Sequence, residues 1–184
     1  MKLLLAIAIS LACVAACDGK SSAGPDGGGT GAVCGGRAGA TCAADHFCDF
    51  GNNRCGADDA PGRCMPRPTF CPTLLVPEPT CGCDGRVYSS PCDATFGGAD
   101  LDESGSCPLG QDTFVCGYRQ CKLRGEVCQR DGSDISGEPA GFSCRGLPAG
   151  CGASPTCACL AGEPCGDQCT GDATTGFTLT CPGG

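Results

Sequence analysis

The sequence predicts a small disulfide-rich fold with two cysteine-rich modules, and three observations lead to this prediction. The 184 residues include 22 cysteines, which exceeds the roughly 10% that marks a disulfide scaffold in an exported chain. Glycine (32) and proline (14) are abundant, whereas the chain has no Trp, two Tyr and seven Phe. So few large side chains cannot build a sizeable apolar core. Disulfides must then stabilise the fold by restricting the unfolded chain.

The first residues, MKLLLAIAISLACVAAC, have the pattern of an export signal. Lys2 gives a positive start, and the apolar run Leu3 to Leu11 is too short to span a bilayer with ease. Val14-Ala15-Ala16 before Cys17 resembles the lipobox of bacterial lipoprotein signals, in which the cysteine is diacylated and becomes the new N-terminus. The resemblance implies a signal peptide over 1–16 and lipidation of Cys17. The alternative is an ordinary signal peptide that is cut nearby after small residues.

The parity of the cysteines favours lipidation. Cys13 leaves with the signal and Cys17 carries the lipid, so an even number remains from Cys34 to Cys181. Several acyl chains on one residue anchor a protein stably in a bilayer. We therefore expect the folded part outside the cytoplasm in the cell envelope, with inner and outer membrane both open. Residues 17–33 are rich in Gly, Ser, Asp and Pro and are predicted to form a flexible tether.

Several functional classes are not expected from the composition. The formal net charge is −8 and no basic patch is interleaved with aromatic residues, so nucleic acid is not an expected partner. The chain lacks a CxxC pair, and its one histidine is His46. Disulfides are therefore favoured over zinc, and we expect no metal or other cofactor. One histidine and scattered acids do not make a catalytic constellation, so the protein is not expected to be an enzyme. We also expect a monomer.

The remaining cysteines fall into two blocks of ten, separated by the cysteine-free stretch 108–115. Two modules, 34–107 and 116–184, joined by a linker over 108–115, are the simplest division. Spacing alone leaves the pairing within each block open. The first block contains Cys34, Cys42, Cys48, Cys55, Cys64, Cys71, Cys81, Cys83, Cys92 and Cys107.

The segment from Cys71 to Cys92 has local signals for a hairpin followed by a short helix. Asp84-Gly85 is a turn pair, and Arg86-Val87-Tyr88 follows as a short strand. Ser90 can cap a helix, Pro91 suits its first turn and Asp93 suits its positive end. Gly97-Gly98 is predicted to end that helix after about two turns.

This order of elements resembles a Kazal domain, whose pattern is C…P-x-C-G-x-D-G-x-x-Y-x-x-x-C…G-x-C. Here the pattern is carried by Cys71, Pro79-Thr80-Cys81-Gly82-Cys83-Asp84-Gly85, Tyr88, Cys92 and Gly105-Ser106-Cys107. The resemblance implies a small α+β module with one short helix and a small antiparallel sheet. It also implies that Cys71 pairs with Cys92, and Cys81 with Cys107.

Four upstream cysteines make the arrangement similar to the follistatin type. That resemblance implies that Cys34 pairs with Cys48, and Cys42 with Cys55. The chain departs from the family because residues 94–99 lack the family's fifth cysteine. Cys83 is an extra cysteine, and the most economical inference is that it replaces the missing one as the partner of Cys64.

Kazal domains that inhibit serine proteases present the loop between their second and third cysteines. Here that loop is two residues longer than the common form, and its candidate inhibitory residues are Pro72, Thr73, Leu74, Leu75 and Val76. The residue that enters the specificity pocket is Thr73 when counted from Cys71 and Leu75 when counted from Cys81. The expected partner is an extracellular or periplasmic serine protease. The alternative is a non-inhibitory structural or protein-binding role, because prolines also make inert loops.

The second module resembles no family that we recognise. Its alternating segment Phe177-Thr178-Leu179-Thr180 predicts a strand beside Cys181, and Asp131 to Gly141 is predicted to be an exposed loop. The expected architecture is a second cysteine-rich unit of loops and strands.

Overall fold

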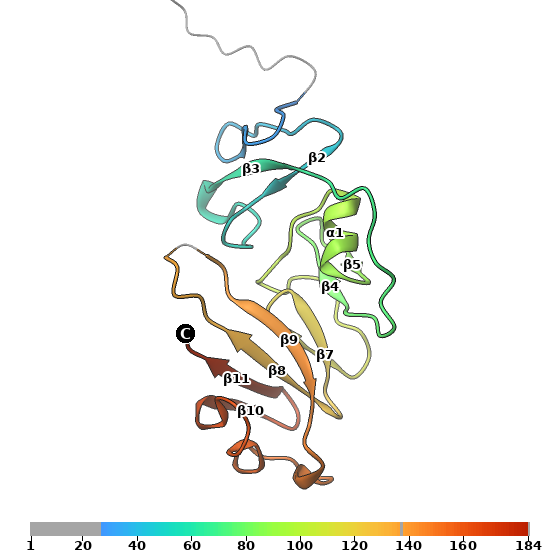
Figure 1. Cartoon of the computed structure of the whole chain (residues 1–184), viewed down its shortest axis with the longest axis vertical. Coiled ribbons are helices and arrows are strands. Elements are labelled where there is room, and N and C mark those ends of the chain that lie inside the picture. Colours follow the sequence, from blue (N-terminus) through green and yellow to red (C-terminus); the bar gives the residue numbers. More distant parts are fainter. Residues whose placement is uncertain (1–26, 137, 184) are drawn as a thin grey trace, which may run out of the picture.

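The structure is a computed structural model that describes residues 27–136 and 138–183. The predicted signal peptide, Cys17 and the first part of the predicted tether lie outside the described residues. Within the described part, the chain forms three small sheets and one α-helix, arranged along the long axis of the molecule (Figure 1). The fold is small and disulfide-rich, as predicted, and strands dominate it.

The N-terminal unit is a three-stranded antiparallel sheet of order β1-β3-β2. Its strands are β1 (Val33–Gly35), β2 (His46–Asp49) and β3 (Pro61–Pro66), with a 3-10 turn at Ala57–Asp59. Gly28 bridges to Cys42, and the N–H of Gly31 donates to the carbonyl of Cys64. Residues 28–35 are therefore bonded to this unit, and the folded part extends upstream of the expected boundary at Cys34.

The central unit contains the predicted hairpin and helix. Strands β4 (Thr80–Cys81) and β5 (Val87–Tyr88) pair antiparallel, and α1 (Pro91–Gly97) follows. The hydroxyl of Ser90 accepts the N–H of Asp93 at 3.1 Å, and Gly98 ends the helix at φ 91°. The local capping signals therefore predicted this helix correctly at both ends.

The central unit and the C-terminal half share one sheet. Strands β6 (Thr113–Cys116) and β7 (Arg119–Lys122) belong to the second half, yet the sheet order is β5-β4-β7-β6. Thr80 and Arg119 are the paired positions between β4 and β7. Strand β6 also takes up the end of the expected linker 108–115. The two halves of the chain are therefore joined by a β ladder as well as by the chain itself.

The C-terminal sheet has the order β10-β11-β8-β9. Its strands are β8 (Glu126–Asp131), β9 (Gly141–Gly146), β10 (Cys169–Asp172) and β11 (Gly176–Cys181), of which β8 and β11 run parallel. Strand β11 confirms the predicted terminal strand. Three 3-10 turns, Ala149–Cys151, Cys157–Leu160 and Gly166–Gln168, cover one end of the sheet. Two small clusters form its core, around Phe114 and Phe142 and around Leu160, Phe177 and Leu179.

All twenty described cysteines are paired, and every disulfide lies within one of the two predicted blocks. In the first block the pairs Cys34–Cys48, Cys71–Cys92 and Cys81–Cys107 agree with those that the resemblance implies. The second block, whose pairing was open, contains Cys116–Cys128, Cys121–Cys144, Cys151–Cys159, Cys157–Cys169 and Cys165–Cys181.

Two expected pairings, Cys42 with Cys55 and Cys64 with Cys83, are wrong. Cys42 pairs with Cys64, and Cys55 pairs with Cys83. The reason is position: Cys64 is buried in the central strand β3, with its Cα 5.5 Å from that of Cys42. Cys55 lies at the far end of the unit, 5.3 Å from Cys83 between Cα atoms. Both separations suit a disulfide. Cys55–Cys83 therefore joins the N-terminal unit to the central one.

In the described part of the chain, no helix has the length and apolar character needed to cross a membrane.

Candidate functional site

The candidate inhibitory loop, residues 72–79, leads from Cys71 into strand β4. Cys71 is bonded to Cys92 on α1, and Cys81 at the end of β4 is bonded to Cys107. In Figure 1 the chain leaves β3, passes α1 and turns back into β4 at the side of the molecule. The loop is therefore fixed covalently at its start and just beyond its end.

The five candidate residues are contiguous on the surface, and Leu75 is their most exposed member. The exposed fraction is 102% for Leu75, 67% for Val76 and 38% for Leu74. Thr73 is also exposed, but like Pro72 and Leu74 it lines a hollow of about 320 Å³ near the start of α1, which Leu75 does not. Of the two candidates for the specificity residue, Leu75 is thus the apolar side chain free to enter a partner's pocket.

Hydrogen bonds hold the C-terminal end of the loop and not its middle. The N–H of Glu78 donates to the carbonyl of Ser89 at 2.8 Å, and the hydroxyl of the buried Thr80 donates to the carbonyl of Glu78 at 2.7 Å. No hydrogen bond among the described residues joins 72–77 to the rest of the protein. The loop therefore depends on its two ends for its shape.

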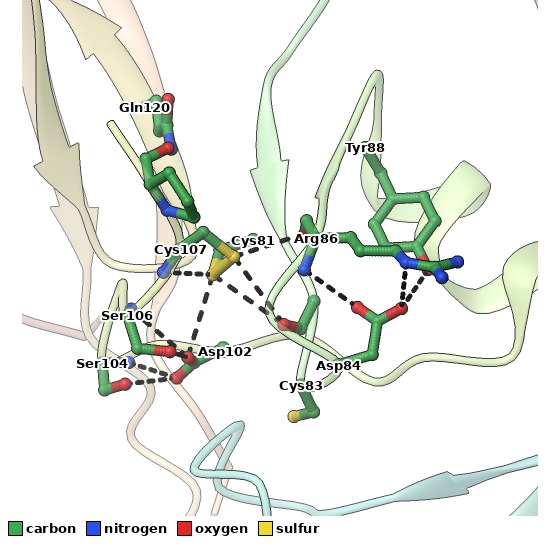
Figure 2. The surroundings of a disulfide bond; sticks show 12 residues. Cys81, Cys83, Asp84, Arg86, Tyr88, Asp102, Ser104, Ser106, Cys107 and Gln120 are labelled. Atoms are coloured by element: carbon green, nitrogen blue, oxygen red, sulfur yellow. Dashed lines mark hydrogen bonds and ion pairs between the residues drawn. A yellow bond between two sulfur atoms is a disulfide. The ribbon is translucent and has the colours of Figure 1, made fainter. Parts of the chain in front are cut away.

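The disulfide at the end of β4 is enclosed by a buried polar network (Figure 2). Asp102, only 3% exposed, accepts the N–H groups of Ser104 at 2.9 Å and Ser106 at 3.3 Å, and both hydroxyls as well. Burial raises the pKa of Asp102, but these hydrogen bonds outweigh it and leave the pKa below its usual value. The N–H of Cys107 donates to Sγ of Cys81 at 3.1 Å. This network fixes residues 102–107, the segment to which Cys81 of β4 is joined by its disulfide.

The turn after β4 is closed by Asp84. Its carboxylate accepts the N–H of Arg86 at 3.1 Å and the hydroxyl of Tyr88 at 2.8 Å, as Figure 2 shows. Burial and the hydrogen bond to Asp84 raise the pKa of Tyr88. The Tyr88 ring packs against Gly82 and Gly97, where a Cβ atom would lie within 2.9 Å of the ring. The tyrosine of the Kazal-like pattern thus packs the hairpin against the helix.

The site offers no thiol for metal or covalent chemistry. The two close groups of three cysteines, around Cys64 and Cys121, consist of disulfide-bonded residues. His46 contacts Thr30 at 2.8 Å and Asp45 at 2.7 Å, at the surface of the N-terminal unit. The cysteines around the loop therefore serve as cross-links.

Two residues of the second half contact the loop and were not foreseen. Arg119 on β7 forms an ion pair with Glu78, and the N–H of Gln120 donates to the carbonyl of Pro79 at 2.9 Å. A groove of about 420 Å³ lies between Val76–Pro79 and the second half. No local signal marks these residues, because they reach the loop only through the pairing of β4 with β7.

Comparisons of the chain with protein-family models, with curated proteins and with solved structures find no match.

Proposed function

We propose that the chain is an inhibitor of a serine protease and acts through the loop Pro72–Val76, with Leu75 as the specificity residue. The observation that carries the proposal is the fully exposed apolar side chain of Leu75 between two disulfide-bonded loop ends. The likeness of the pattern to Kazal domains supports the same function.

The physical basis is preorganisation. A loop that is already held in its bound shape loses little conformational entropy when it docks, so its contact area is converted into affinity. The disulfides of Cys71 and Cys81 would also keep both halves of the loop in place after a cut, which favours religation over release. Protease–inhibitor interfaces of ordinary size are among the tightest protein complexes for such reasons.

A second candidate is a non-inhibitory envelope protein whose loop only binds a partner or covers the fold. The unbonded middle of the loop, residues 72–77, favours this candidate, because mobility there would make the loop a substrate. The two candidates predict different rates of cleavage beside Leu75: a protease cuts an inhibitor slowly at that bond and cuts a non-inhibitory loop rapidly.

The test uses oxidised residues 18–184, without the cysteine proposed to carry the lipid, against chymotrypsin-, trypsin-, elastase- and subtilisin-like proteases. The expected result is tight inhibition with slow cleavage of one loop bond, identified by mass spectrometry. Leu75→Asp should abolish inhibition, whereas Thr73→Asp should leave most of it. Rapid turnover of the loop, or no inhibition by the wild-type chain, would favour the second candidate.

We further propose that Cys17 carries the lipid that anchors the chain in the cell envelope. Support comes from the lipobox-like residues before it and from the ten disulfides, which are typical of proteins that fold outside the cytoplasm. Metabolic labelling with palmitate should mark the wild-type chain and not Cys17→Ser. Equal labelling of both chains would contradict the proposal.

A further inference from the structure

We propose that Arg119, in the second half of the chain, is a positioning residue for the loop. It holds the loop's C-terminal end through Glu78, so the second module takes part in inhibition. This inference rests on the proposed function.

The contact itself is an ion pair that is partly removed from water. Nη1 of Arg119 donates to Oε2 of Glu78, and the exposed fractions of the two side chains are 15% and 46%. The guanidinium carbon also lies 5.7 Å from the centre of the Tyr118 ring. Such a pair is screened less than one between two exposed side chains. Glu78 is thereby bonded to Ser89 through its N–H and to Arg119 through its carboxylate, besides the bond that its carbonyl accepts from Thr80.

The strand that carries Arg119 is itself held by hydrogen bonds and by nearby disulfides. Its backbone bonds the loop end on either side of Thr80: Gln120 donates to Pro79, and Tyr118 accepts the N–H of Cys81 at 2.6 Å. The disulfides Cys116–Cys128 and Cys121–Cys144 tie both ends of this segment to the C-terminal half. The apolar cluster around Phe114 and Phe142 is therefore connected to the loop through β7.

The side chain of Arg119 reaches from β7 to Glu78 at the end of the loop. The loop residues Val76–Pro79 form one wall of the 420 Å³ groove, and Lys122, Glu126 and Ser143 lie along the rest of it. Within the described residues, the bond from Arg119 to Glu78 is the single side-chain hydrogen bond between 72–79 and the second half. Without the guanidinium, the loop end keeps its backbone hydrogen bonds to β7 but loses the ion pair of Glu78.

The expected effect therefore falls on loop order and affinity and not on folding. Arg119→Ala should weaken inhibition about tenfold, because the loop must then be ordered on binding. The midpoint of guanidinium unfolding should stay close to that of the wild type. Arg119→Lys keeps the charge and should recover part of the loss. The double variant Glu78→Arg/Arg119→Glu should recover more than either single variant.

Arg145→Ala is the matched control. Arg145 is another ion-paired arginine of the second half, with 38% of its side chain exposed. It pairs with Glu163 at 3.3 Å and Gln129 at 2.6 Å and does not line the groove. It should leave both inhibition and loop order unchanged.

The experiment measures inhibition and, without any protease, the backbone amide NMR order parameters of residues 74–76 and 78. The positioning role is upheld if the order parameters are lower in Arg119→Ala than in the wild type and are unchanged in Arg145→Ala. Equal order parameters in wild type and Arg119→Ala overturn it. If the wild-type chain inhibits nothing, the proposed function fails, and the order parameters still decide the role of Arg119.

Discussion

The backbone N–H of Phe50 donates a 2.8 Å hydrogen bond to the carboxylate of Asp100, fifty residues further along the chain. Asp100 is 4% exposed and lies where the N-terminal unit meets the central one. The N–H of Glu103 donates to the carbonyl of Asn53 at 2.7 Å, and Cys55–Cys83 closes the same junction. Burial raises the pKa of Asp100 to about 6, and the nearby charge of Asp49 adds to the rise.

The first prediction is that the free energy of unfolding falls as pH rises from about 4 to about 6. An acid whose folded pKa lies above its unfolded value stabilises the fold at low pH and loses that contribution as pH passes the folded value. Asp100→Asn should keep the acceptor for Phe50, remove the buried charge and be more stable than wild type at pH 7, by about 3 kcal/mol.

Guanidinium unfolding without reductant, at half-unit steps of pH, checks this prediction. Burial also raises the pKa of Asp49, so that residue acts in the same direction. Asp102, with its lowered pKa, acts in the opposite direction and only at lower pH. A wild-type chain whose stability does not change between pH 4 and 6 would show that Asp100 is not the buried acid described here.

The second prediction concerns the two pairings that differ from the follistatin-type scheme. Trypsin cuts after Arg54 and Arg63, and cyanogen bromide cuts after Met65, so Cys55 and Cys64 separate into different peptides. Mass spectrometry without reduction should find 55–63 linked to 66–86, and 64–65 linked to 38–54. Recovery of 55–63 linked to 38–54 would instead support pairing of Cys42 with Cys55.

The third prediction concerns a glycine between β6 and β7. Gly117 has a φ of 56°, and a Cβ atom there would lie within 2.5 Å of the ring of Phe142. That ring also packs edge-on against Tyr118, with 5.4 Å between centroids. Gly117→Ala should destabilise the fold by about 3 kcal/mol, through backbone strain and the clash together.

Gly125→Ala separates the two contributions. Gly125 also has a positive φ, 102°, but no atom lies within 4 Å of the position that an alanine methyl group would occupy. It should cost about 1 kcal/mol of unfolding free energy, from strain alone. Equal losses in the two variants, measured by guanidinium unfolding, would exclude the clash with Phe142.

The fourth prediction concerns the cap of α1. Ser90→Ala removes the acceptor of the Asp93 N–H and should lower the free energy of unfolding by about 1 kcal/mol. The neighbouring Ser89 is exposed, so Ser89→Ala is the control and should change little. Faster amide exchange at Asp93 and Ala94 in Ser90→Ala alone would locate the effect at the helix start. Identical exchange in both variants would argue against the cap.

The elements that the sequence predicts correctly are those whose structure depends on neighbouring residues. Ser90, Pro91 and Gly98 determine a helix within a few positions of themselves, and both of its ends were predicted. The pair Asp84-Gly85 likewise predicted its own turn. Three of the five pairings expected in the first block are present, all of them implied by the resemblance.

The features that the sequence does not predict depend on contacts between segments that are distant along the chain. Cys55 and Cys64 are both near in sequence to several cysteines, and only the packing of β3 against the strands beside it decides their partners. Arg119 could not be assigned to the candidate site, because nothing in the residues around it indicates that β7 pairs with β4. The loop residues themselves were located correctly on the surface, but their inhibitory role stays a prediction.

The strand order of the C-terminal sheet has a consequence for how the chain matures. Strand β11 lies between β10 and β8, although it is the last of these strands in chain order. During synthesis, the parallel neighbour of β8 is therefore made only after the whole segment between the two strands. Cys165 meanwhile lacks its partner Cys181 and is open to mispairing with earlier thiols. The Cys165–Cys181 disulfide can therefore close only after the last strand has been made.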